Sequence, residues 1–287
     1  MELMIICTLN FERFNKKSKR IMKKVALITG VSKNIGKSIC KKYIDNGYQV
    51  IGTHKDFLDD PDELKKFKSE FPNVILHKVD LCNQNDVTRF IDEMRQYKFD
   101  VIVNNAGMFN MMPNGAVRNE FYNFDLQAFI DVANCNFISV ARICLELKEC
   151  INENGNIIII SSGAGSNGAF ASISYNATKA ALINLTQSLS NSFHYFKKVR
   201  VNCVSPGWIS GEGGAMNTND DNPFMKNVAR VTPMGRNGRT NEVADVIFYL
   251  TSEQASFITG ANIAVDGGYS HFDVIYYEEA TGESLLK

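Results

Sequence analysis

Two side chains in the second half of the chain have the types and spacing of a proton-transfer pair. The segment Tyr175-Asn176-Ala177-Thr178-Lys179 begins a stretch of helical apolar periodicity, and a spacing of four residues puts Tyr175 and Lys179 on one helical face. An ammonium group near a phenol favours the phenolate and lowers the tyrosine pKa. We therefore expect Tyr175 to exchange a proton with a substrate oxygen near neutral pH. A bare Y-x-x-x-K spacing is common by chance, so its meaning depends on the surrounding residues.

A serine lies where its hydroxyl could assist such a tyrosine. Ser162 follows the apolar run 157–160 and precedes Tyr175 by thirteen residues. Its hydroxyl could hydrogen-bond a substrate oxygen and stabilise the charge that develops there. The neighbouring Ser161 is the alternative, but side chains alternate faces along a strand, so Ser161 should point away if Ser162 points in. We expect Ser162 to be the functional serine.

A glycine-containing turn near the start of the chain has the features of a phosphate-binding site. Thr29-Gly30-Val31-Ser32-Lys33-Asn34-Ile35-Gly36 directly follows a β-branched run and precedes a helical stretch. Such a turn lets backbone N–H groups and the positive end of the helix approach a pyrophosphate closely. The spacing differs from the G-x-G-x-x-G of the common dinucleotide fingerprint, and a glycine turn often only ends a strand. The turn therefore needs support from other motifs.

Short apolar runs alternate with helical stretches from Lys24 onward, and these elements must position the candidate residues. The runs are apolar without interruption, as in strands covered on both faces. They occupy residues 25–29, 49–52, 74–76, 101–103, 157–160 and 200–204. Helical stretches separate them, among them residues 35–46, 86–97 and 126–150. This succession predicts an α/β fold, a single doubly wound Rossmann-like domain with a parallel sheet flanked by helices.

Two longer segments interrupt this alternation. Residues 108–125 exceed what a βα loop needs, and residues 210–223 are rich in Gly, Asn and Asp. Both should be loops near the carboxyl ends of strands, where ligands bind in such folds. We expect residues 210–223 to form a substrate lid.

Further short motifs accompany the glycine turn. They are Asp80-Leu81 after the third strand, N-N-A-G at 104–107, T-P-M-G-R at 232–236, E-V-A at 242–244, T-G at 259–260 and V-D-G-G at 265–268. With Thr29, Gly30 and Gly36, which match T-G-x-x-x-G-x-G, these motifs resemble in content and order those of the classical short-chain dehydrogenase/reductase family. Asn34 replaces the middle glycine, and asparagine tolerates left-handed backbone better than most residues. The resemblance covers roughly residues 24–269.

The resemblance implies a role for each matching residue. The family's catalytic tetrad maps onto Asn136, Ser162, Tyr175 and Lys179. Asn136 would hold a water that relays protons to Lys179, although a helix-packing role stays open. The implied cofactor-binding residues are Gly30, Ser32, Lys33, Asn34, Ile35, Gly36, His54, Lys55, Asp80, Leu81, Asn105, Ala106, Gly107, Tyr175, Lys179, Pro206, Gly207 and Ile209. One departure is Gly211, which stands where the family often has a phosphate-contacting threonine; Ser210 is the candidate substitute.

The end of the second strand bears on which dinucleotide would bind. An acidic residue there would accept hydrogen bonds from the adenosine ribose and repel a 2′-phosphate, which favours NAD. Here the stretch reads G-T-H-K at 52–55, with no carboxylate before Asp56. Lys55 and Lys33 could both reach a 2′-phosphate, and a basic residue at the Lys33 position accompanies NADP in the family. We therefore expect NADP(H) to be favoured over NAD(H); two exposed lysines without a ligand are the ordinary alternative.

The overall pattern is most similar to the 3-oxoacyl-(acyl-carrier-protein) reductase branch of that family. This implies NADP(H)-dependent reduction of a carbonyl to an alcohol, or the reverse, on a small-molecule or acyl-thioester substrate. A carrier protein is acidic, and Lys197, Lys198 and Arg200 could supply part of a basic docking patch. The long segment 108–125 departs from that branch, so a sugar, polyol or small-ketone reductase is an alternative. A catalytically silent NADP-binding protein is the alternative from another class.

Composition excludes several other classes. The 287 residues include 31 basic and 31 acidic ones, so no overall charge favours nucleic acid or an anionic membrane. The four histidines are scattered without metal-ligand spacing, which predicts no metal site, and no G-x-S-x-G segment suggests a hydrolase. Seven cysteines without a C-x-x-C pair or a secretory leader fit reduced thiols in a cytoplasmic protein.

The ends of the chain and its assembly complete the expectations. We expect the domain to span residues 23–270, after a poorly ordered extension at 1–22 and before a tail at 271–287; a later translation start at Met22 stays open. Apolar residues on the stretches 126–150 and 172–196 exceed what one core-facing stripe needs. We expect a homotetramer or homodimer assembled through these helices.

Overall fold

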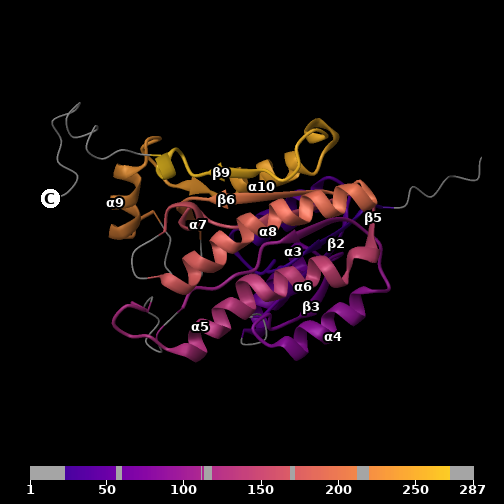
Figure 1. The fold of residues 1–287 in the computed structure, drawn as a ribbon, viewed down its shortest axis with the longest axis horizontal. Coiled ribbons are helices and arrows are strands. Elements are labelled where there is room, and N and C mark those ends of the chain that lie inside the picture. The colour runs from indigo at the N-terminus through magenta and orange to yellow at the C-terminus, as the bar shows by residue number, and fades with distance from the viewer. Residues whose placement is uncertain are drawn as a thin grey trace, which may run out of the picture.

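A computed structural model of the chain describes residues 23–55, 60–110, 112, 118–168, 172–211 and 220–271. The predicted N-terminal extension, residues 1–22, and all but the first residue of the predicted tail lie outside the described residues. Figure 1 shows a sheet with helices on both of its faces. The predicted doubly wound α/β architecture is thus confirmed.

The sheet of the described part contains seven strands, and every neighbouring pair is parallel. Its strands are β1 (Val25–Ile28), β2 (Gln49–His54), β3 (Ile75–Lys78), β4 (Phe99–Asn104), β5 (Ile151–Ile160), β6 (Arg200–Pro206) and β9 (Asn262–Val265). They lie in the order β3-β2-β1-β4-β5-β6-β9. The order therefore reverses between β1 and β4, the point at which ligands bind in open α/β sheets. A separate short ladder pairs β7 (Ile209–Ser210) with β8 (Gly238–Arg239).

Helices cover both faces of the sheet. One face carries α4 (Gln84–Met94), α5 (Leu126–Ala133), α6 (Ser139–Glu146) and α8 (Ile173–Lys197), which lie nearest the viewer in Figure 1. The other face carries α2 (Asn34–Asp45), α3 (Pro61–Glu70) and α10 (Thr240–Leu250). The remaining helices are the short α7 (Ala164–Asn167) and α9 (Pro223–Val231), with 3₁₀ turns at Lys148–Cys150, Glu253–Ala255 and Tyr269–His271.

Two hydrophobic cores, one on each side of the sheet, explain why the central strands carry apolar residues on both faces. Along β5, Ile157 and Ile159 pack beneath α4, α6 and α8, whereas Ile158 and Ile160 pack on the side of α2 and α10. All four side chains are at most 5% exposed. Burying each contributes roughly 1.5–3 kcal/mol. Both layers are thereby fixed to the strands whose ends carry the candidate residues.

Three elements differ from the sequence prediction. The strand β9 was not predicted; it is a four-residue edge strand, and the exposure of its side chains alternates. The helix predicted over residues 126–150 is interrupted by a π-turn, η2 (Asn134–Ile138), and its α-helical part ends at Glu146. The chain then enters β5 at Ile151, six residues before the predicted start of that strand.

Candidate active site

The turn after β1 and the turn after β4 are locked together by side chains. The Thr29 hydroxyl oxygen accepts hydrogen bonds from the backbone N–H groups of Asn105 and Ala106, each at 3.0 Å. In return, the Asn105 amide nitrogen donates to the carbonyl oxygens of Thr29 (3.0 Å) and Gly30 (3.1 Å). The N-N-A-G segment therefore fixes the backbone of the glycine turn.

The glycine turn brings its backbone so close together that one position excludes any side chain. A β-carbon on Gly36 would lie 1.9 Å from the Gly30 carbonyl oxygen. Asn34, at the family's middle glycine, has φ +48°, so the predicted left-handed conformation is present. Lys33 is the exposed N-cap residue of α2, and Ser32 lies in the bend just before it. Ile35, in the first turn of α2, packs on the core. The N-terminus of α2 therefore follows directly on a tight glycine turn, an arrangement that can bind an anion.

The ends of β2 and β3 flank this turn. The Thr53 hydroxyl accepts a hydrogen bond from the Gly30 N–H at 3.1 Å, and His54 is buried at the end of β2. The Lys55 ammonium lies 2.9 Å from the Asp80 carboxylate, and Leu81 is buried beside it. Partial burial alone would raise the pKa of Asp80, but the contacts with the Lys55 ammonium and with Cys82 together outweigh burial, so the net pKa is lowered. The lysine predicted to bind phosphate and the aspartate predicted to flank adenine thus form an ion pair.

The predicted catalytic residues that follow β5 and begin α8 lie together. The Lys179 ammonium is 5.5 Å from the centre of the Tyr175 ring and donates a hydrogen bond to the Ile160 carbonyl oxygen at 2.9 Å. The hydroxyls of Ser162 and Tyr175 are hydrogen-bonded. The Ser161 hydroxyl instead donates to the Lys179 carbonyl oxygen at 2.7 Å. The two serines therefore face different partners, and it is Ser162 that meets Tyr175.

Burial shifts the proton affinities of this pair. Burial raises the pKa of Tyr175 above its ordinary value, and the hydrogen bond with Ser162 opposes that rise. Burial also lowers the pKa of Lys179 to about 8, against opposing contributions from Cys135 and Cys203. The expected lowering of the tyrosine pKa is thus wrong, because removal from water disfavours the phenolate. The same burial makes a neutral Lys179 accessible near neutral pH.

Asn136 lies in the π-turn and holds the backbone that follows N-N-A-G. Its Oδ1 accepts a hydrogen bond from the Met108 N–H at 2.8 Å, and its Nδ2 donates to the Met108 carbonyl oxygen at 2.9 Å and to the Thr178 hydroxyl at 3.3 Å. A β-carbon on Gly107 would lie 3.2 Å from both Asn136 Oδ1 and Lys179 Nζ. Asn136, Gly107 and Lys179 are therefore neighbours, whereas the water relay stays a prediction.

The end of β6 supplies the last predicted group. The Pro206 carbonyl accepts from the Gly163 N–H, and the Gly207 N–H donates to the Val265 carbonyl, each at 3.0 Å. Ile209 then pairs with Gly238 in the β7–β8 ladder. These bonds hold residues 206–209 beside the turn that carries Ser162.

The segment after β7 reaches back to the glycine turn. A β-carbon on Gly211 would lie only 2.3 Å from Asn34 Oδ1, so the Asn34 side chain fills the space that a side chain at position 211 would need. The two departures from the family motif are therefore neighbours. Ser210, the candidate substitute for the missing threonine, donates its hydroxyl proton to the Asp220 carboxylate. Most of the predicted lid, residues 212–219, lies outside the described residues.

Two contacts to the start of α8 were not predicted. The ring of Phe109 stacks on that of Tyr175, with centroids 4.0 Å apart and an interplanar angle of 15°. Glu120 accepts two hydrogen bonds from Ser174. Both partners come from the long segment between β4 and α5, whose unusual length was the one signal in the sequence. Nothing local to Phe109 or Glu120 indicates a partner so far along the chain.

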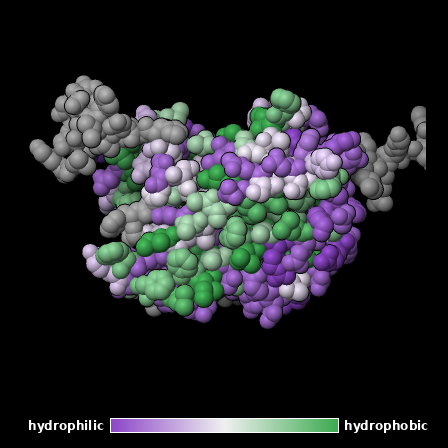
Figure 2. Space-filling view, viewed as in Figure 1, coloured by the Kyte–Doolittle hydropathy of each residue, from purple (hydrophilic) through white to green (hydrophobic). Residues whose placement is uncertain are grey.

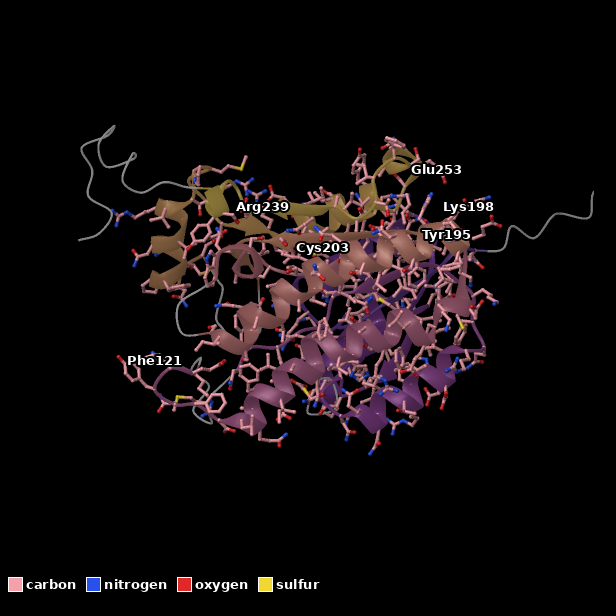
Figure 3. The ribbon with its side chains drawn as sticks, in the orientation of Figure 1. Phe121, Tyr195, Lys198, Cys203, Arg239 and Glu253 are labelled. Carbon is pink, nitrogen blue, oxygen red and sulfur yellow. The ribbon has the colours of Figure 1, made fainter. Side chains whose placement is uncertain are left out.

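The structure contradicts the predicted basic docking patch. Lys197 and Lys198 pair with Glu149 (3.0 Å) and Glu153 (3.1 Å). Arg200 is buried and donates to backbone carbonyl oxygens. Lys197 and Lys198 lie at the C-terminal end of α8, roughly 33 Å along the helix from Tyr175 at 1.5 Å per residue, and Figure 3 shows Lys198 at that end. Arg200 begins β6 just beyond it. They cannot form a patch at the mouth of the site.

Comparisons with known proteins agree with this geometry. A family model described as enoyl-(acyl carrier protein) reductase matches residues 30–270. The 3-oxoacyl-[acyl-carrier-protein] reductase of Buchnera aphidicola is 31% identical over 254 residues, covering 86% of this chain and 98% of that protein. L-fucose dehydrogenase of Bos taurus is 31% identical over 253 residues, covering 85% of this chain and 88% of that protein. The crystal structure of BdcA in complex with NADPH superimposes with a TM-score of 0.76 at 25% identity, covering 87% of this chain and 96% of that one.

Proposed function

The chain belongs to the short-chain dehydrogenase/reductase family, and we propose that it is an NADP(H)-dependent oxidoreductase that interconverts a carbonyl and an alcohol. The observation that carries this proposal is the grouping of Ser162, Tyr175 and Lys179 beside the glycine turn. Ser162 and Tyr175 share a hydrogen bond, and the Lys179 ammonium lies 5.5 Å from the tyrosine ring. A binding protein without catalysis would not need such a proton-transfer group.

The residues present fit a dinucleotide phosphate cofactor. The backbone around Gly36 leaves no room for a β-carbon, and the N-terminus of α2 opens beside it. Lys33 and Lys55 are the basic residues that would meet a 2′-phosphate, with Lys55 shared between that phosphate and Asp80. The similar BdcA structure contains NADPH, which supports the same preference here. When bound, the cofactor supplies the hydride; the chain supplies binding, orientation and the proton.

The side chains divide the remaining work. Ser162 and Tyr175 would hold the substrate oxygen between their hydroxyls, where hydrogen bonds stabilise developing negative charge. Tyr175 keeps its proton in the resting state because burial raises its pKa, so it is a proton donor for reduction. Lys179, with a pKa of about 8, can return a proton to Tyr175 near neutral pH. Asn136 holds the backbone of Met108 in place opposite Lys179.

For the substrate, a 3-oxoacyl thioester is our first candidate. The Buchnera relative is a reductase of that class, and it matches this chain over 98% of its own length. The Phe109 ring stacked on Tyr175 places an apolar surface beside the reacting position, which suits a carbonyl flanked by an alkyl chain. The bovine relative favours a second candidate, a sugar.

The test is NADPH consumption by purified protein with an acetoacetyl thioester, keto-sugars or small ketones, in parallel with reduction of NADP⁺ or NAD⁺ in the presence of L-fucose. Turnover of the thioester that disappears in Tyr175→Phe supports the first candidate. Activity confined to sugars or ketones assigns the chain to the second. NADPH binding without turnover of any of these carbonyls refutes the enzyme proposal and leaves a silent NADP-binding protein.

We also propose that the chain forms a homotetramer or homodimer through α5, α6 and α8. Figure 2 shows a continuous hydrophobic surface over these helices. Its exposed side chains include Leu126, Ile130, Leu145 and Ile173. A patch of this kind on a water-soluble fold marks an interaction site. The double variant Ile130→Glu, Leu145→Glu should reduce the mass measured by analytical ultracentrifugation to that of a monomer; a monomeric wild-type protein would contradict the proposal.

Two further observations bear on where the protein works. The helical segment Leu126–Glu146 is, within the described residues, long and apolar enough to cross a membrane. Its inner face packs on the sheet and it contributes Asn136 to the site, so we interpret its apolar outer face as a subunit interface. The six cysteines of the described residues are free thiols, which supports our proposal of a cytoplasmic location.

A further inference from the structure

A buried carboxylate from the segment before α5 binds the first turn of the catalytic helix. Glu120 is 3% exposed and Ser174 is fully buried. Glu120 Oε2 accepts a hydrogen bond from the Ser174 N–H at 2.8 Å, and Oε1 accepts one from the Ser174 hydroxyl at 2.5 Å. Hydrogen bonds to an ionised acceptor are about twice as strong as neutral ones. A carboxylate withdrawn from water in this way persists only where such bonds compensate its burial.

The contact meets a need of α8 that its own sequence does not fulfil. The first N–H groups of a helix lack partners within the helix, and the side chain of the preceding residue usually accepts from one of them. Among the described residues that precede α8, the N-cap residue Ser172 makes no such side-chain bond. Glu120 accepts the Ser174 N–H instead, from 54 positions earlier in the chain. Its negative charge also lies at the positive end of the helix dipole.

The segment that carries Glu120 is itself braced. Arg118 donates from its backbone N–H to the Asn110 carbonyl oxygen at 2.8 Å and from its side chain to Asn110 Oδ1 at 3.1 Å. The same guanidinium lies 3.4 Å from the Asp125 carboxylate, which caps α5. The neighbouring Phe121 is 75% exposed and projects from the edge of the fold (Figure 3). Glu120 is therefore turned inward on a fixed support.

The same segment contacts the catalytic tyrosine directly. Tyr175 follows Ser174 in the chain, and the Phe109 ring lies parallel to its ring at 4.0 Å. Two consecutive residues at the start of α8 are thus held from one segment, Ser174 by a carboxylate and Tyr175 by a ring. A movement of Ser174 would be transmitted to the Tyr175 hydroxyl through a single peptide unit.

We propose that Glu120 is a positioning residue for Tyr175. It makes no contact with reacting atoms; it fixes the N–H and hydroxyl of Ser174 and through them the placement of the tyrosine. Its catalytic consequence rests on the proposed function, whereas the capping itself does not.

The test compares Glu120→Ala, Glu120→Gln and the matched control Ser172→Ala. Glu120→Ala should lower kcat about 10- to 100-fold, since small misplacements of catalytic groups have effects of that size, with the NADPH dissociation constant unchanged within about twofold. Glu120→Gln should restore kcat to within about threefold of the wild type, because its amide can accept from the Ser174 N–H and donate to the hydroxyl. Ser172→Ala should match the wild type.

Amide hydrogen exchange of the peptide that covers the start of α8 needs no substrate and separates this inference from the proposed function. Exchange there should accelerate at least about tenfold in Glu120→Ala and stay near the wild-type rate in the other two variants. Unchanged exchange in Glu120→Ala would overturn the inference whether or not the protein reduces a carbonyl. Faster exchange with an unchanged kcat would overturn the link to Tyr175, as would equal losses of kcat in all three variants.

Discussion

Adding one methyl group at Gly211 tests how the glycine turn is coupled to the segment after β7. A β-carbon there would lie 2.3 Å from Oδ1 and 2.8 Å from Cγ of Asn34, and the next nearest described atom is Asn34 Cβ at 3.5 Å. Among the described residues, every close contact thus comes from one side chain. Gly211→Ala must therefore displace the Asn34 amide, whereas in an Asn34→Gly background the same methyl group meets the other described atoms only at ordinary van der Waals distances.

The expected loss of stability in Gly211→Ala follows from the rotamer and the polar contact that the Asn34 side chain would lose. Forcing a side chain off its preferred rotamer costs about 0.5–1.5 kcal/mol, and losing a polar contact adds about as much again. Gly211→Ala should therefore destabilise the wild-type protein by about 1–3 kcal/mol. In the Asn34→Gly background, where glycine suits φ +48°, the change should be neutral or stabilising by up to about 1 kcal/mol, since alanine restricts the unfolded chain.

The assay is equilibrium unfolding in urea of the four proteins of this double-mutant cycle, followed by the fluorescence of Trp208, the single tryptophan of the chain. A matched control is Gly47→Ala. Gly47 has φ +83° and, among the described residues, no atom within 4 Å of a β-carbon, so its cost should be the same in both backgrounds.

Additivity would refute the reasoning. Distant, independent sites add within about 0.3–0.5 kcal/mol, so an interaction energy of that size between Asn34→Gly and Gly211→Ala would mean that the two positions do not share one space. A coupling of about 1 kcal/mol or more, absent with Gly47→Ala, is the expected result.

Three other predictions concern the proposed chemistry. Tyr175→Phe should lower kcat about 10²- to 10⁴-fold in steady-state assays while leaving NADPH binding intact; near-native turnover would exclude the proton-transfer role. Because burial lowers the pKa of Lys179 to about 8 from 10.5, the unfolded chain binds more protons between these pH values, so wild-type stability should rise with pH relative to Lys179→Met. Between pH 7 and 10.5, the free energy of unfolding of the wild type should rise by up to about 3 kcal/mol relative to that of Lys179→Met, as measured by urea unfolding. Parallel pH profiles of the two proteins would contradict this prediction. Lys33→Ala and Lys55→Ala should each weaken NADPH binding about tenfold or more beyond any effect on NADH in titration calorimetry; equal losses would remove the basis for an NADP preference.

The strands of the interior could be predicted because each is buried on both faces. Ile157 to Ile160 alternate between the two cores, which makes the run continuous in the sequence and readable as a strand. The edge strand β9 has only four residues with alternating exposure, and its apolar run is limited to residues 263–265. The π-turn at Asn134–Ile138 changes helix winding without changing apolar composition, and the pattern therefore predicts one continuous helix.

The site could be predicted where its chemistry is local in the chain. Tyr175 and Lys179 are one helical turn apart, so their spacing alone places them together. Contacts between distant segments leave no such signal: the Lys55–Asp80 ion pair and the Glu120–Ser174 bonds depend on how separate elements are packed. Burial likewise decides whether the pKa of Tyr175 rises or falls, and the spacing of four residues does not reveal how buried the ring is.

Because of the π-turn, the number of residues between Asn134 and Ile138 determines which side chains face the site and which face the core. Each residue of an α-helix advances the side chains by about 100° around the axis, and a π-turn is one residue wider. Asn136 within the turn faces Met108, while Val140 and Ile143 after it face the core. Deleting one residue between Asn134 and Ile138 would restore regular winding and rotate one of these faces away from its partner. An alignment gap at this point would therefore move a side chain of the candidate site even if every residue of that site were identical.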